Sequence, residues 1–83
     1  MKVWGGNVMF SSGQRRAIIA AESKKEAVAL IQATSAGYGF SRYYFDTYWG
    51  ETGNTKELEI AQHRGVWVNL AQWEELTPLE AKP

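Results

Sequence analysis

The sequence predicts a small α+β domain. An N-terminal antiparallel hairpin and a closing strand form a sheet that packs with one main helix and two short helices. Three observations carry this prediction. Two strand-like runs flank the turn-forming residues 11–14, "SSGQ". After Ser23 the apolar period changes from two to that of a helix. The short run "VWV" at 66–68 is typical of a buried strand.

Length and composition limit the class of protein. The 83 residues predict one domain over 1–77, followed by a C-terminal tail over 78–83. Nine basic and nine acidic residues cancel, so no overall field attracts nucleic acid or an anionic membrane. The chain has no cysteine, which fits a reducing compartment. No apolar run is long enough to span a bilayer, and we expect a cytoplasmic protein.

The two N-terminal runs differ in their apolar pattern. In "KVWGGNVMF", the side chains of Trp4, Val8 and Phe10 fall on one face at a period of two. In "RRAIIAAE", apolar residues occupy both faces. The second run therefore predicts an inner strand that is covered on both sides.

The main helix is predicted to begin at Ser23. Ser23 and Glu26 have the spacing of a capping box, in which a hydroxyl and a carboxylate each accept a hydrogen bond from a backbone N–H. Gly37 and Gly39 are predicted to end the helix. Its inward face is formed by residues at helical spacing: Ala27, Leu30, Ile31 and Thr34.

Residues 41–49, "SRYYFDTYW", fit two interpretations. As a strand, their aromatic side chains alternate between two faces, in keeping with β-propensity. As a helix, Ser41 is the N-cap, Arg42 pairs with Asp46 one turn later, and Gly50 ends the segment. We favour the helix. Its inward face then consists of Tyr44, Phe45, Tyr48 and Trp49.

The segment "GETGN" at 50–54 is predicted to be a tight joint between two helices. Asn54 and Glu57 repeat the capping-box spacing in front of "KELEIAQHRG". Gly65 is expected to stop this helix in a left-handed conformation, with His63 and Arg64 near the negative end of its dipole.

The residues after the predicted strand at 66–68 suggest one last helical turn. Asn69 with Gln72 has the spacing of a helix cap. Trp73 and Leu76 follow it three residues apart, as on one face of a helix, and Pro78 then ends the turn.

With these elements placed, the chain resembles small uncharacterised proteins encoded by phages and prophages. The resemblance rests on a strand with "AAESKKEA", then "FSRYYFDTYW", "ETGNTKELEIA" and "GVWV", over residues 3 to 68. It implies an origin in a mobile element, and therefore a location in the host cytoplasm. It also supports the helical interpretation of 41–49. It assigns no functional residue.

No catalytic or metal-binding pattern stands out. His63, the only histidine, would need a carboxylate to orient it and a nucleophile within reach, and the sequence places neither. Glu57 and Glu59 diverge on a helix, and zinc bound without cysteine normally needs more than one histidine. We therefore predict no catalytic residue, no metal, no cofactor and no enzymatic activity.

The dense aromatic segment at 38–49 carries the functional hypothesis. Its rings cannot all point inward from one short element, so Tyr38 and Tyr43 are expected to face solvent, where tyrosines often anchor protein interfaces. We predict a protein-binding module with Arg15, Arg16 and Arg42 beside these tyrosines. A phage-encoded inhibitor of a host defence system would suit such a surface, and a homodimer is a second form of protein partner. In the alternative, the same arginines and Tyr43 bind nucleic acid through phosphate contacts and base stacking.

Overall fold

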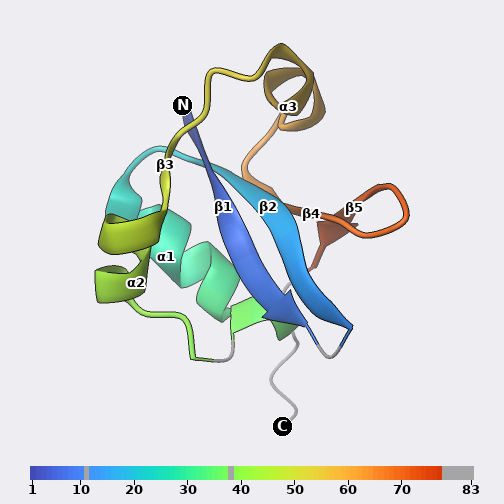
Figure 1. Ribbon diagram of the computed structural model, residues 1–83. Coiled ribbons are helices and arrows are strands. Elements are labelled where there is room, and N and C mark those ends of the chain that lie inside the picture. The colour runs from blue at the N-terminus through green and yellow to red at the C-terminus, as the bar shows by residue number, and fades with distance from the viewer. Residues whose placement is uncertain (11, 38, 78–83) are drawn as a thin grey trace, which may run out of the picture.

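Figure 1 shows the computed structural model, which describes residues 1–10, 12–37 and 39–77. Within these residues, five antiparallel strands form one sheet in the order β3-β1-β2-β4-β5. The elements are β1 (Lys2–Phe10), β2 (Gly13–Ala21), α1 (Lys24–Gln32), the 3-10 turn η1 (Ser35–Gly37), α2 (Arg42–Tyr48), β3 (Gly50–Glu51), α3 (Thr55–Ile60), β4 (Gly65–Asn69) and β5 (Trp73–Leu76). Helices α1 and α2 cover one face of the sheet, and α3 covers one end of the other. The predicted α+β class is confirmed.

Strand β2 is an inner strand, as its sequence predicts. It pairs with β1 on one side and with β4 on the other. Ile19 faces the main core beneath α1 and α2, whereas Ile18 faces a smaller core beneath α3, and both are fully buried. Two covered faces require apolar residues on both sides of the strand.

The main core is centred on Phe45, the inward residue of α2. Its ring meets Trp4 of β1 edge-on at 5.8 Å between centroids, and stacks with Trp49 at 5.9 Å. Phe40, from the loop before α2, meets Trp49 edge-on at 5.5 Å. Each such pair adds about 0.5–1.5 kcal/mol beyond the area that it buries. Aromatic rings from β1, from the loop before α2 and from α2 with its C-cap therefore pack together and stabilise the contact of α2 with the sheet.

The N-terminus of α1 has the predicted cap. The hydroxyl of Ser23 accepts a hydrogen bond from the N–H of Glu26 at 3.2 Å. The carboxylate of Glu26 accepts from the N–H of Glu22 at 2.7 Å, one residue before the cap itself. It also meets Arg64 Nε at 2.8 Å, which ties the start of α1 to the chain just before β4.

The C-terminus of α1 comes earlier than predicted. The helix ends at Gln32, so the prediction that Gly37 and Gly39 end it is wrong. Thr34 gives the physical reason. Its buried hydroxyl donates to the carbonyl of Ile31 at 2.8 Å, and this bond favours the tighter turn of η1 over another turn of α-helix.

Residues 42–48 are helical, which decides between the two interpretations of that segment. The hydroxyl of Ser41 accepts from the N–H of Tyr44 at 3.1 Å, as an N-cap does. Phe45 and Trp49 are buried, as predicted. The prediction that Tyr48 also faces inward is wrong, since it is 67% exposed. Phe45 and Trp49 already fill the space between this two-turn helix and the sheet.

The segment between α2 and α3 contains more than the predicted joint. Residues 50–51 form β3, which pairs with the outer edge of β1. Asn54 caps α3 as predicted, because its side-chain oxygen accepts from the N–H of Glu57 at 3.1 Å. The reciprocal bond of a capping box is replaced: the carboxylate of Glu57 binds Arg16 and Thr52 instead.

The end of α3 differs from the prediction. The helix stops at Ile60, and Ala61 leaves it with φ −85° and ψ 66°. The predicted left-handed stop at Gly65 is therefore wrong, because Gly65 begins β4 with a φ outside the positive range. His63 and Arg64 lie beyond the helix and not in its last turn.

The last described element is a strand, so the predicted helical turn capped by Asn69 and Gln72 is wrong. Residues 73–76 form β5 and pair antiparallel with β4, with Leu76 opposite Val66. A single isolated turn of helix is unstable, whereas a neighbouring strand supplies hydrogen bonds and packing. The predicted tail over 78–83 lies outside the described residues.

Candidate functional site

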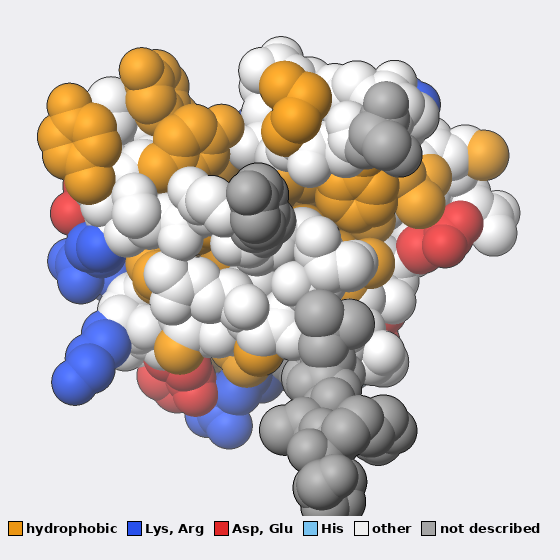
Figure 2. All heavy atoms as spheres, turned by 90° about the horizontal axis from the view of Figure 1, so that it is seen from below, with side chains coloured by type: hydrophobic (Ala, Val, Ile, Leu, Met, Phe, Trp, Pro, Cys, Tyr) orange, Lys and Arg blue, Asp and Glu red, His pale blue; other side chains and the backbone are white. Residues whose placement is uncertain are grey.

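The outer face of α2 exposes two large aromatic side chains. Phe45 points into the core with 1% of its surface exposed, whereas Tyr43 is 78% and Tyr48 is 67% exposed. Figure 2 shows hydrophobic side chains gathered at the corner of the molecule that α2 forms, next to acidic and basic ones. We use the name α2 surface for the exposed residues of this helix: Arg42, Tyr43, Asp46, Thr47 and Tyr48.

The charges of the α2 surface are paired within the helix. Arg42 Nε donates to both carboxylate oxygens of Asp46 at 3.1 Å, as the spacing of four residues predicts. The hydroxyl of Thr47 donates to the carbonyl of Tyr43 at 2.7 Å. The α2 surface therefore combines exposed aromatic rings with one cation and one anion, and carries no net charge.

The side of α2 nearest the sheet protects the edge of β1. Strand β3 pairs with β1 only at Trp4 and Gly5, and the carbonyl of Asn7 lies further along the same edge. That carbonyl accepts hydrogen bonds from the hydroxyl of Tyr44 at 3.1 Å and from the indole N–H of Trp49 at 3.3 Å. The side chains of Tyr44 in α2 and of Trp49, the C-cap of α2, thus occupy an edge group that another strand could otherwise bind.

A hollow of about 240 Å³ lies beside this edge, between the hairpin and the loop before α2. Met9, which is 68% exposed, is one of the residues that line it. The described lining residues of the hollow are mostly apolar: Val8, Met9, Gln14, Ala36, Gly39, Phe40 and Tyr44. None of these described residues carries a carboxylate or an imidazole, so they offer mainly apolar contact.

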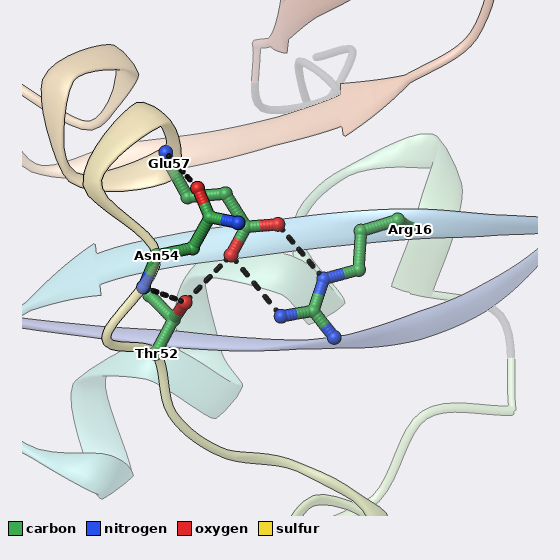
Figure 3. Close-up of polar contacts among 4 residues, drawn as sticks. All are labelled: Arg16, Thr52, Asn54 and Glu57. Carbon is green, nitrogen blue, oxygen red and sulfur yellow. Dashed lines mark hydrogen bonds and ion pairs between the residues drawn. The ribbon is translucent and has the colours of Figure 1, made fainter.

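A cluster of polar side chains, separate from the α2 surface, joins α3 to the sheet (Figure 3). Arg16 of β2 donates to the two oxygens of the Glu57 carboxylate at 3.0 and 3.1 Å. The hydroxyl of Thr52 donates to the same carboxylate at 2.6 Å and accepts from the N–H of Asn54 at 3.1 Å. The side chain of Arg16 lies across Gly5, where a Cβ would overlap with the guanidinium.

The hydrogen bonds from Arg16 lower the pKa of the Glu57 carboxyl below its ordinary value. Burial opposes this effect, while the Thr52 hydroxyl and the positive charge of Arg16 add to it. Glu57 is 7% exposed and each of its oxygens has a partner. The cluster is therefore a structural connection, in which a buried carboxylate is paired and hydrogen-bonded.

The structure does not bring the predicted arginines together. Arg15 shares the helix-covered face of the sheet with Val8, its partner in β1, and donates to the hydroxyl of Ser12 at 3.2 Å. Arg16 lies on the opposite face and is bound by Glu57. Arg42 belongs to the α2 surface and pairs with Asp46. Tyr43 is exposed on the same helix.

Sequence reasoning missed the exposure of two residues, Tyr48 and Met9. Helical spacing predicts Tyr48 on the inward face, and the sequence assigns Met9 no function. The alternation of β1, which places Met9 on the opposite face from Val8, was the signal that could have shown the exposure of Met9. The predicted contact residue Tyr38 lies outside the described residues.

His63 lies apart from the α2 surface. Its ring meets Trp67 at 5.2 Å between centroids, and Nε2 lies 3.4 Å from a carboxylate oxygen of Glu75. Within residues 1–10, 12–37 and 39–77, there is no group of three or more His, Cys, Asp or Glu side chains placed to share a metal ion.

No protein-family model, curated protein sequence or solved structure matches this chain. None of the helices in the described part of the chain is long and apolar enough to cross a membrane.

Proposed function

We propose that the protein is a non-enzymatic module that binds another protein through the α2 surface. The observation that carries this proposal is the exposure of Tyr43 and Tyr48 on a helix that packs on the core through Phe45. Tyrosine offers a large contact area and a hydroxyl with few rotatable bonds, and it is frequent among residues that dominate binding energy.

The surroundings of the two tyrosines support the same proposal. The ion pair of Arg42 with Asp46 supplies a polar rim, and the hollow lined by Phe40 and Tyr44 adds apolar area. Protein interfaces have this composition, with an apolar centre and a polar margin. We propose that the protein inhibits a host defence protein by covering part of its surface. This activity is in keeping with the resemblance to phage and prophage proteins.

A pull-down with matched variants tests the proposal. The tagged wild-type chain is expected to retain a specific protein that Tyr43→Ala combined with Tyr48→Ala retains at least about fivefold less, which corresponds to a loss of about 1 kcal/mol or more. Leu58→Ala is the control, because Leu58 is an exposed apolar residue on α3, 45% exposed, outside the α2 surface. Equal retention by the folded double variant and the wild type would contradict the proposal.

A further inference from the structure

We propose that the α2 surface binds a second copy of this chain, with the two α2 helices packed antiparallel across a twofold axis. The inference rests on the proposed function, since it names a second protein partner for the same surface. Its basis is that the α2 surface is complementary to itself in charge and in the placement of its aromatic side chains.

The charge argument concerns Arg42 and Asp46. They lie on the same side of α2, one turn apart, with the cation towards the N-terminus and the anion towards the C-terminus. A twofold axis through the middle of the helix pair places each Arg42 opposite Asp46 of the partner subunit. The two intrahelical pairs then become one network of four alternating charges, with no like charges in contact.

The aromatic side chains favour the same arrangement. Tyr43 and Thr47 lie in the middle of the exposed face, with the charged pair on one side of them. Tyr44 and Tyr48, whose rings are 5.0 Å apart, lie on the other side. We call Tyr44 and Tyr48 the tyrosine row, and Arg42 and Asp46 the charged row. The antiparallel arrangement about the twofold axis brings the tyrosine row of one copy against the tyrosine row of the other. A parallel arrangement would instead place the tyrosine row against the charged row.

The position and size of α2 define what kind of dimer to expect. Figure 1 shows α2 at the periphery of the fold, away from α3. The helix has only seven residues. Stable dimers bury about 800 Å² on each partner, more than one short helix supplies. We therefore expect a reversible dimer that forms at high protein concentration.

A mixing experiment with charge reversals tests the inference by sedimentation equilibrium from micromolar to millimolar concentration. The Arg42→Glu variant has two negative charges on α2, and the Asp46→Arg variant has two positive charges. Each variant alone is expected to associate at least about tenfold more weakly than the wild type, because like charges then oppose each other twice in the dimer. An equimolar mixture is expected to restore association as a heterodimer. Broken intrahelical pairs cannot explain that rescue, since both variants lack the pair.

The control pair has the same net charges at a different place. Lys56→Glu and Glu59→Lys reverse two exposed residues of α3, and mixing them should produce no more association than the wild type shows. A wild-type chain that stays monomeric at millimolar concentration, or variants that associate no better mixed than alone, would overturn the inference. If sedimentation rejects the second copy but the tyrosine double variant loses a different protein in the pull-down, the proposed function stands.

Discussion

The indole ring of Trp49 occupies the space that a side chain at Gly6 would fill. A Cβ built on Gly6 would overlap with the ring. From this position Trp49 stacks on Phe45 and donates its N–H to the carbonyl of Asn7. The absence of a side chain at Gly6 therefore allows α2 to lie close against β1.

Gly6→Ala is expected to lower the free energy of unfolding by about 1–3 kcal/mol, because the added methyl group must displace a packed ring. Gly53→Ala is the matched control, since a Cβ there has no atom within 4 Å. Urea denaturation of both variants measures the difference. Equal midpoints for the two variants would show that Trp49 adjusts to Gly6→Ala without cost.

Glu57 makes stability dependent on pH. Its pKa is lowered in the folded protein, so its stabilising effect is present above the pKa of the unfolded carboxyl, about 4.3, and is lost as the pH falls through the folded value. Glu57→Gln should cost about 1–3 kcal/mol at neutral pH, since it removes hydrogen bonds to a charged group. The difference in the free energy of unfolding between the wild type and Glu57→Gln should disappear as the pH is lowered below about 4.3. Denaturation curves at several pH values measure this difference, and Glu59→Gln on the same helix is the control.

Loss of either confirmed helix cap should destabilise the protein. Ser23→Ala and Asn54→Ala each remove an acceptor for a backbone N–H at a helix start, which costs about 0.5–2 kcal/mol. Ser35→Ala serves as the control, because Ser35 is exposed and lies outside both caps. Thermal or urea unfolding reports the change. An unaltered midpoint for Asn54→Ala would mean that the bonds of Glu57 hold α3 without the cap.

Two neighbouring aromatic residues of α2 should respond in opposite ways. Phe45→Ala is expected to cost about 3–5 kcal/mol, because it leaves a cavity in the centre of the main core. Tyr43→Ala should change stability by no more than about 0.5 kcal/mol, as exposed positions do. Circular dichroism during urea titration measures both. A large loss with Tyr43→Ala would mean that its ring supports the fold.

The arrangement of the arginines predicts weak binding to nucleic acid. Arg15 and Arg16 lie on opposite faces of the sheet, and Arg16 and Arg42 are already paired with carboxylates. We therefore expect little affinity for a mixed-sequence oligonucleotide at low or moderate salt, measured by fluorescence anisotropy. Tight binding that weakens steeply with salt and is lost when the three arginines are replaced together would restore the nucleic-acid alternative.

The sequence by itself determined the elements whose signals are local. Ser23, Ser41 and Asn54 each accept from an N–H three residues along the chain, so spacing alone located three helix starts. The two strand-like N-terminal runs and the turn residues between them located the hairpin, and the apolar residues on both faces of β2 placed it inside the sheet. The cap spacing and the apolar pattern of a strand both lie within a few residues of the sequence, so they can be recognised without knowledge of the fold.

Only the tertiary structure decided the features that depend on partners distant in the chain. Residues 73–76 have spacing suitable for a helix, but the neighbouring β4 makes them a strand. Glu57 has the position of a capping-box residue, yet its carboxylate binds Arg16, 41 residues away. Tyr48 is exposed because Phe45 and Trp49 fill the space beneath α2. In each case a long-range contact competes with a local preference worth about 1 kcal/mol or less, and the larger packing or hydrogen-bonding energy prevails.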